Sequence, residues 1–203
     1  RLAPAGPGPS PRYFHTAVLD ATRDQVLVFG GLDDTGARRD LWALSLDDAP
    51  RWTALAAVGA PPAARYQHSA VYDTELERMI VFGGTDIMTV HGDAWSLTFA
   101  NNRVPVWSRI GTTGPVPSAR SGQAAVYDPV GRRMVIFGGW DMASGPLEDI
   151  WTLSLGASPA WEAVPCDGVE PCARTIASGT LDLARNRLIV FGGTGSGDRY
   201  SLD

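Results

Sequence analysis

The sequence predicts an all-β protein assembled from four consecutive repeats, and three observations lead to this prediction. The tripeptide Phe-Gly-Gly occurs four times along the 203 residues, at intervals of 53, 55 and 54 residues, beginning at Phe29, Phe82, Phe137 and Phe191. Short apolar runs rich in Val, Ile and Phe precede each tripeptide and are bounded by Gly, Pro and Asp, which is typical of buried strands. No segment shows apolar periodicity over the length of a helix, so each repeat is expected to contain strands alone.

The first repeat shows its four strands in order. His15–Leu19 is the first strand, and a tight turn leads to the second strand, Val26–Phe29. The glycine pair ends the second strand, where a side chain would collide with neighbouring backbone or block a turn with positive φ. Leu41–Leu46 is the third strand because its bulky apolar residues alternate with smaller or polar ones. The fourth strand begins at Trp52, and a proline-rich segment then leads into the next repeat.

Three further landmarks recur in a fixed order around each Phe-Gly-Gly. An arginine stands 17 positions before it, at Arg12, Arg65, Arg120 and Arg174. An aspartate that is followed two positions later by an aromatic residue begins the third strand, at Asp40, Asp93, Asp149 and Asp198. A second tryptophan follows in three repeats, at Trp52, Trp107 and Trp161. A four-stranded antiparallel unit that recurs about every 50 residues is the pattern of a β-propeller blade.

On these landmarks the chain resembles the kelch-repeat family of β-propellers, of the type found in the central domain of galactose oxidase. The resemblance covers essentially the whole chain, 1–203, as a single propeller segment with blades near 10–55, 63–110, 118–164 and 172–203. The last blade lacks the second tryptophan and is incomplete. The resemblance implies a ring of about six or seven blades, so further blades of the same chain, or a second copy, are expected to close it. A closed four-bladed ring is the alternative.

Composition excludes several classes of protein. A hydrophobic content of 44% and a formal net charge of −5 exclude a disordered chain, and no apolar run is long enough to span a membrane. All 17 basic residues are arginines, which removes lysine Schiff-base chemistry and the phosphate-loop lysine. A mildly acidic chain with scattered arginines is a poor binder of nucleic acid. The absence of lysine beside abundant Ala, Arg, Gly and Pro suggests a GC-rich, bacterial genome.

The recurrent arginines are the first candidates for ligand binding. In a meander, the loop before the first strand and the loop after the second strand lie on one face, and long, variable loops make that face the candidate binding face. By resemblance to the kelch adaptors of ubiquitin ligases, Arg12, Arg65, Arg120 and Arg174 would line a pocket for acidic peptides, where each guanidinium could hold a carboxylate through two hydrogen bonds. The alternative is structural, with each arginine paired to the recurrent aspartate between blades.

Four more residues of the loops on this face are candidates. Asp33, Asp86 and Asp141 stand two positions after the glycine pairs and could bind hydroxyl groups or cations, or could instead cap turns. Trp140 stands where the other repeats have Leu or Thr, so it could be a stacking anchor for a sugar or a peptide. The alternative is that Trp140 packs under its own loop.

The two cysteines and two of the histidines are candidates for a covalent pair and a metal-binding pair. Cys166 and Cys172, the only cysteines, lie in the last connection between repeats. A local disulfide is expected, which would indicate an extracellular, cell-surface or periplasmic location; reduced thiols in the cytoplasm are the alternative. His15 and His68 occupy the same position in successive repeats, where local hydrogen bonding is favoured over a metal site.

The sequence thus favours a non-catalytic recognition module that binds a protein or peptide ligand through the arginine-lined face. The alternative, from resemblance to sugar oxidases and epimerases of the kelch type, is an exported protein that binds or modifies carbohydrate, with a glycan as ligand. No cofactor, metal or nucleic acid is expected, and the question of catalysis stays open.

Overall fold

The computed structural model describes residues 4–101, 103–165 and 172–195. Within these ranges the chain forms strands and turns without a helix, which confirms the all-β prediction. Three of its sheets contain a four-stranded antiparallel meander, the arrangement expected of kelch blades.

Each of the first three repeats folds into its own sheet, and the described strands of the fourth form two two-stranded sheets; the four units are called blades 1 to 4. Blade 1 consists of β1 (Thr16–Asp20), β2 (Gln25–Phe29), β5 (Leu41–Ser45) and β6 (Trp52–Ala54). Blade 2 consists of β8 (Ser69–Asp73), β9 (Arg78–Phe82), β10 (Ala94–Ala100) and β11 (Val104–Arg109). Blade 3 consists of β12 (Ala124–Asp128), β13 (Arg133–Asp141), β14 (Gly145–Ser154) and β15 (Trp161–Val164). Blade 4 contains β17 (Ser178–Asp182) paired with β18 (Arg187–Phe191), and β16 (Arg174–Thr175) paired with β19 (Thr194–Gly195).

Short strands outside the meanders complete the sheets. A small hairpin of β3 (Leu32–Asp33) and β4 (Gly36–Ala37) follows β2. The proline-rich connection after blade 1 forms β7 (Val58–Gly59), which pairs in parallel with β11, the outer strand of blade 2. Equivalent parallel bridges join Ala5 to Arg51 and Thr113 to Ala160. Each of these three segments therefore adds to the outer edge of the blade that it leads into.

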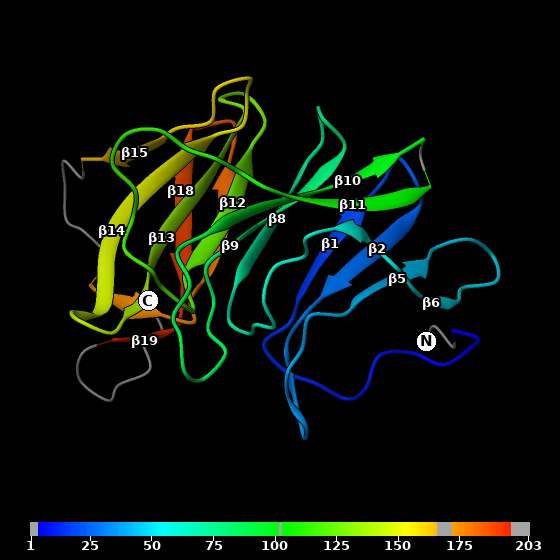
Figure 1. Cartoon of the computed structure of the whole chain (residues 1–203). Helices are drawn as coiled ribbons and strands as arrows, with labels where there is room; N and C mark the ends of the chain where they lie inside the picture. Colours follow the sequence, from blue (N-terminus) through cyan, green and yellow to red (C-terminus); the bar gives the residue numbers. More distant parts are fainter. Residues whose placement is uncertain (1–3, 102, 166–171, 196–203) are drawn as a thin grey trace.

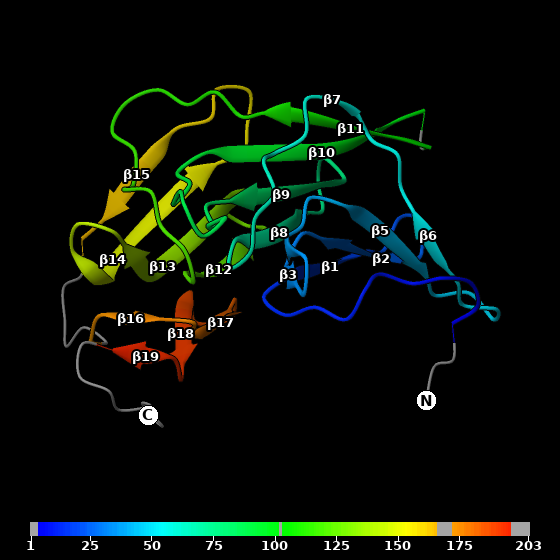
Figure 2. The ribbon, with the colours of Figure 1, turned by 60° about the horizontal axis from the view of Figure 1, so that its bottom comes forward.

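The blades stand side by side around their first strands. β1 contacts β8, β8 contacts β12, and β12 contacts β17, so the first strand of each blade is its inner strand. Figure 2 shows the resulting arc, with blade 1 at one end and blade 4 at the other.

The core lies between blades. Phe29 of blade 1 packs on Trp107 of blade 2 with ring centroids 4.9 Å apart, and Phe82 of blade 2 packs on Trp161 of blade 3 at 4.7 Å. Both phenylalanines are fully buried, whereas Phe191 of blade 4 is 58% exposed. The phenylalanine of one repeat therefore meets the second tryptophan of the next, which explains why both landmarks recur.

The glycine pair follows from the close approach of neighbouring blades. Gly30 and Gly31 have φ values of +64° and +102°, a backbone region that favours glycine. A Cβ on Gly30 would lie 2.7 Å from the carbonyl oxygen of Arg65, and the Gly31 N–H donates to that oxygen at 2.9 Å. The predicted collision with neighbouring backbone is confirmed, and the backbone that would be struck belongs to the next blade.

Candidate functional site

One end of the blades carries the loops that precede the inner strands and the loops that follow the second strands. The two loops of each blade pair with each other, through bridges between Tyr13 and Leu32, Tyr66 and Thr85, Ser121 and Trp140, and through β16 with β19. This end, called the loop face, lies at the bottom of Figure 1 and is brought forward in Figure 2. The prediction that both sets of loops share one face is confirmed.

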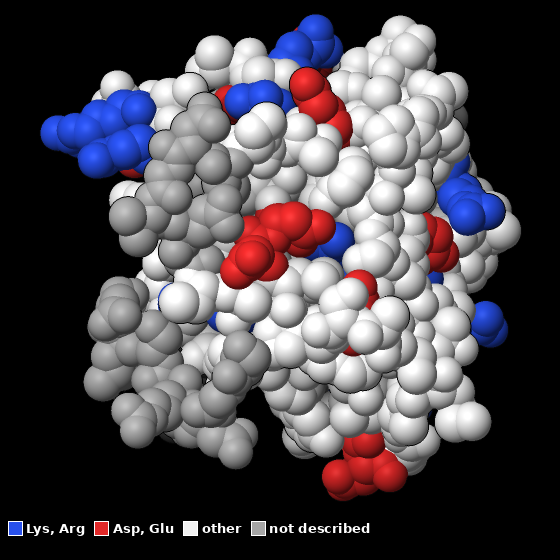
Figure 3. Space-filling view, turned by 90° about the vertical axis from the view of Figure 1, so that its left-hand side faces the viewer, with Lys and Arg blue, Asp and Glu red and all other residues white. Residues whose placement is uncertain are grey.

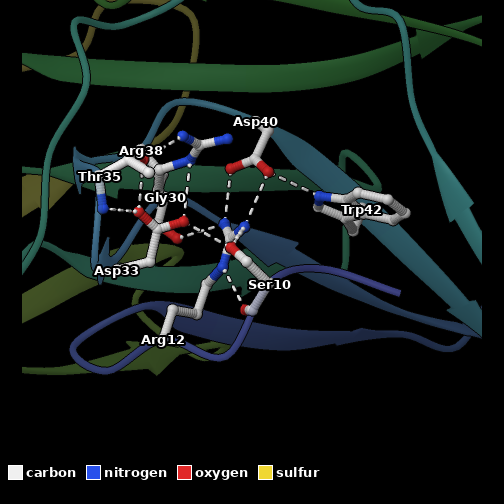
Figure 4. A network of polar contacts seen from close by, with 8 residues as sticks. All are labelled: Ser10, Arg12, Gly30, Asp33, Thr35, Arg38, Asp40 and Trp42. Carbon is white, nitrogen blue, oxygen red and sulfur yellow. Dashed lines mark hydrogen bonds and ion pairs between the residues drawn. The ribbon is translucent and has the colours of Figure 1, made fainter. Parts of the chain in front are cut away.

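In blade 1, Arg12 reaches from the loop before β1 to Asp40, which precedes β5 (Figure 4). Its Nη1 and Nη2 atoms donate to the two carboxylate oxygens of Asp40 at 2.6 and 2.9 Å. Nη1 also donates to the carbonyl oxygen of Gly30 at 3.0 Å, and Nε donates to that of Ser10 at 3.1 Å. The Nε1 of Trp42 donates to Asp40 at 2.8 Å. The recurrent arginine, aspartate and tryptophan thus form one hydrogen-bonded unit, called the staple.

The staple is repeated in blades 2 and 3, and its arginine is also present in blade 4. Arg65 donates to both carboxylate oxygens of Asp93 at 2.8 and 3.1 Å, and Arg120 to those of Asp149 at 2.6 and 2.9 Å. Arg174 donates to the carbonyl oxygen of Gly192 at 3.1 Å; Asp198, its expected partner, lies outside the described residues. The three described ion pairs of the staples lie within a blade and not between blades, because the loop before the inner strand and the start of the third strand meet at the same end of one sheet.

The staples leave little of each guanidinium for a ligand. The side chains of Arg12, Arg65 and Arg120 are 3%, 0% and 1% exposed. Burial alone would raise the pKa of Asp93, but the hydrogen bonds and the charge of Arg65 lower that pKa below its usual value. Both members of the pair are therefore ionised and matched to each other. This geometry favours the structural alternative for the recurrent arginines.

The three loop aspartates cap turns. Each accepts hydrogen bonds from backbone N–H groups two or three positions further on, which belong to Thr35 for Asp33, to Met88 and Thr89 for Asp86, and to Ala143 and Ser144 for Asp141. Asp33 also lies 3.4 Å from Arg38, and Asp86 lies 3.6 Å from His91. Asp141 is 6% exposed and has no ion-pair partner among the described residues. All three aspartates thus cap turns, as the alternative interpretation predicted. Asp141 differs from the other two because no opposite charge lies beside it among the described residues.

A row of backbone hydrogen bonds, which sequence reasoning missed, runs from blade to blade on this face. The residues two positions after the recurrent arginines, called the inner rim, are Phe14, Gln67, Gly122 and Ile176. Each N–H donates to the carbonyl oxygen of the preceding rim residue, at 3.0, 2.8 and 2.6 Å. All four have φ between +54° and +68°, which is uncommon outside glycine. The repeated strain, about 1–3 kcal/mol per residue, indicates that blade docking requires this backbone conformation.

Exposed apolar side chains gather on the loop face. They come from the loops of all four blades: Tyr13 (56% exposed), Phe14 (38%), Ile87 (66%), Met88 (85%), Trp140 (38%), Met142 (71%) and Ile176 (47%). Trp140, predicted as a stacking anchor, lines a hollow of about 340 Å³ together with Ile87, Met142 and Ile176. Trp140 therefore stands at a surface hollow rather than wholly beneath its own loop.

His68 contributes to the docking of blade 2 on blade 1. The Nε2 of His68 lies 2.7 Å from the hydroxyl of Thr16 on the preceding blade, and Gln123, its counterpart in blade 3, donates to Ser69 at 2.9 Å. Burial lowers the pKa of His68 to about 3, so the ring is neutral near pH 7. The expectation of a local hydrogen bond is therefore wrong for His68, because its bond joins two blades. No group of three metal-ligating side chains occurs among the described residues.

The predicted disulfide falls partly outside the part of the chain that the structure describes. Cys172 is exposed, and Cys166 is not among the described residues. The pairing, and the extracellular or cell-surface location inferred from it, stay predictions. In the described residues, no helix has the length and apolar character to cross a membrane.

Comparisons with known proteins agree on one family. The model of the KLHDC2/KLHL20/DRC7 Kelch-repeats domain matches residues 1–106 and 101–202. Over 186 residues the chain is 35% identical to the leucine-zipper-like transcriptional regulator 1 homolog of Drosophila melanogaster, which covers 88% of this chain and 18% of that protein. It is 30% identical to the serine/threonine-protein phosphatase BSL2 of Arabidopsis thaliana, over 100% of this chain and 19% of that protein.

A third relative, the Rab9 effector protein with kelch motifs of Bos taurus, is 27% identical over 100% of this chain and 54% of that protein. The chain thus spans between about a fifth and about half of the length of these relatives. All three are eukaryotic. The comparisons lend no support to a bacterial source, to a galactose-oxidase-like subtype or to a glycan ligand.

Proposed function

The chain belongs to the kelch-repeat family, and on that basis we propose that it is a non-catalytic interaction scaffold that binds a protein or peptide through the loop face. The observation that carries this proposal is the gathering of exposed aromatic, methionine and isoleucine side chains on that face. Tyr, Trp, Phe and Met are enriched where proteins bind each other, and contiguous exposed apolar surface marks interaction sites.

The opposite face of the blades provides the contrast. The exposed apolar side chains at that end are aliphatic, and they include Leu76, Val130 and Leu183 in the tight turns between the first and second strands, with Leu19 and Val104 near strand ends. Scattered residues of this kind are normal on protein surfaces. The aromatic and methionine side chains and the longer loops are on the loop face, which is why the proposal assigns binding to it.

Charge supports a protein partner rather than a polyanion. On the side that carries β14 and β15, Figure 3 shows mostly uncharged surface with acidic and basic groups interspersed. A nucleic-acid partner would require a basic stripe. The staple arginines do not supply one, because their charges are buried and matched by aspartates.

The proposal is tested by comparing two triple variants of equal charge. One carries glutamate at Ile87, Met88 and Met142 on the loop face, and the other carries glutamate at Leu76, Val130 and Leu183 on the opposite face. Affinity capture from extracts of cells that express the protein is expected to lose its specific partners only with the loop-face variant. Equal retention by both variants, with unchanged melting temperatures, would contradict the proposal.

A further inference from the structure

The loop face is least crowded at blade 3. The two positions that follow the recurrent arginine are occupied by Tyr13 and Phe14 in blade 1, Tyr66 and Gln67 in blade 2, Ser121 and Gly122 in blade 3, and Thr175 and Ile176 in blade 4. Blade 3 therefore has the smallest pair. The β13–β14 hairpin of the same blade carries Trp140 and Met142 above this gap.

The gap forms the hollow of about 340 Å³ described above. Ile87 and Val90 come from blade 2, Trp140 and Met142 from blade 3, and Ile176 from blade 4. Every described residue that lines the hollow is uncharged. The other lining residues are polar, namely Tyr66, Gln67, Thr85, Ser121 and Thr175. The volume lies within the range of about 300–1,000 Å³ that is usual for ligand pockets, and the apolar part of the lining suits an uncharged apolar side chain.

A second hollow of about 250 Å³ adjoins the first. The two hollows share Val90 and Met142, and the second is also lined by Asp141, Ser118 and Ala143. Although burial alone would raise the pKa of Asp141, hydrogen bonds from the backbone N–H groups of Ser144 and Ala143 and from the side chains of Ser118 and Ser144 lower that pKa below its usual value. An ionised carboxylate without a cationic partner among the described residues thus borders an open hollow.

The Asp141 carboxylate is held by hydrogen bonds from its own turn but has no opposite charge beside it among the described residues, so a ligand cation at the edge of the hollow would gain a charge-assisted hydrogen bond. We propose that the two hollows bind a short peptide segment in which an apolar side chain stands beside an arginine or lysine. The apolar side chain occupies the larger hollow against Trp140, and the cation lies at Asp141 in the smaller one. This inference rests on the proposed function and names the chemistry of the ligand, which is opposite in charge to the acidic peptide that the arginines alone had indicated.

The first test is a positional-scanning library of capped tetrapeptides, screened against the whole chain. Leu, Ile, Met or Phe next to Arg or Lys is the expected preference. Selection of acidic tetrapeptides, selection of apolar residues without a neighbouring cation, or no selection at all would each overturn the inference. The proposed function is judged separately by the two triple variants, so either can fail while the other stands.

The second test uses the best tetrapeptide as a fluorescent probe with matched variants. Asp141→Asn keeps an acceptor for the turn but removes the charge; Asp33→Asn is its control, because Asp33 caps the equivalent turn of blade 1 and borders neither hollow. Asp141→Asn is expected to weaken the arginine probe about tenfold and to leave its citrulline analogue unchanged. Asp33→Asn should change neither. Equal effects on both probes would overturn the assignment of the cation to Asp141.

The apolar hollow has its own matched pair. Met142→Ser should weaken the probe several-fold, since Met142 lines both hollows. Val130→Ser should not, since Val130 is 84% exposed in a turn of the opposite face and lines neither hollow. Unchanged probe binding by Met142→Ser, or an equal loss with both variants, would overturn the inference.

Discussion

The staples and the inner rim lie on the same face of the same blades, but the staple residues are alike from blade to blade whereas the residues beside the rim vary. The described ion pairs of the staples are alike in three blades, from Arg12 with Asp40 to Arg120 with Asp149. The residues beside the rim change from Tyr13 in blade 1 to Ser121 in blade 3. A residue that recurs in every blade has a structural role that all blades share, which here is to hold the two loops of the blade together. A residue that only one blade carries is free to serve a ligand.

The largest expected effect comes from breaking a staple. Arg65→Ala leaves the Asp93 carboxylate and the Gly83 carbonyl without their donor and should destabilise the chain by about 3–5 kcal/mol. Denaturant unfolding measures this loss. Arg38→Ala is the control, because the Arg38 side chain is 38% exposed, and it should change stability by less than about 0.5 kcal/mol. If the Arg65→Ala protein were as stable as the parent but no longer bound its ligand, the staple arginines would serve binding and not stability.

The tryptophan of the staple should come next. Trp95 donates from Nε1 to Asp93 at 2.7 Å and packs on the core cluster between blades 1 and 2. Since Trp95 is only partly buried, Trp95→Ala should cost about 3 kcal/mol, the lower end of aromatic core replacements. A melting temperature within a degree or two of the parent would contradict this role.

The blade-docking histidine should give a smaller, pH-dependent effect. Because burial lowers the pKa of His68 from 6.5 to about 3, the folded chain binds fewer protons than the unfolded chain between these values. Neutral His68 thus adds stability that is fully present above pH 6.5 and is lost as the pH falls toward 3. Between pH 7.5 and pH 5 the loss should be about 2 kcal/mol.

The replacement His68→Gln tests whether His68 causes the predicted loss of stability at low pH. The glutamine copies Gln123, which makes the equivalent contact in blade 3, and it should flatten the fall in unfolding free energy between pH 7.5 and pH 5. His15→Gln is the comparison: His15 lies at an exposed position, although burial and the charge of Arg12 lower its pKa as well, so this variant should flatten the profile less than His68→Gln does. An unchanged pH profile in His68→Gln would show that other groups govern it.

The smallest effect on stability is expected at the residue unique to blade 3. The Trp140 backbone pairs with Ser121 through its N–H and carbonyl groups, while its side chain is 38% exposed. Trp140→Ala should therefore shift the unfolding free energy by less than about 0.5 kcal/mol while weakening tetrapeptide binding. A large loss of stability instead would make Trp140 a packing residue of its own hairpin.

Much of the fold could be predicted because the same pattern of residues occurs in each of the four repeats. The recurrence of Phe29-Gly30-Gly31 and its counterparts indicated strands, turns and blades before any contact was known. The strands observed in blade 1 begin and end within about a residue of those expected. Local patterns suffice here, since strand alternation and glycine turns depend on neighbouring residues.

The binding site could be predicted only in part, because side-chain exposure depends on contacts between distant residues. Periodicity identified the arginines and aspartates but not that they pair within a blade and bury each other's charge. It singled out Trp140 and Asp141 but not the two hollows, which need Ile87, Trp140 and Ile176 from three blades in one place. Sequence alone determined the repeated blade; the docking of unlike blades decided which side chains stayed open to solvent, since that docking brings together loops that lie far apart along the chain.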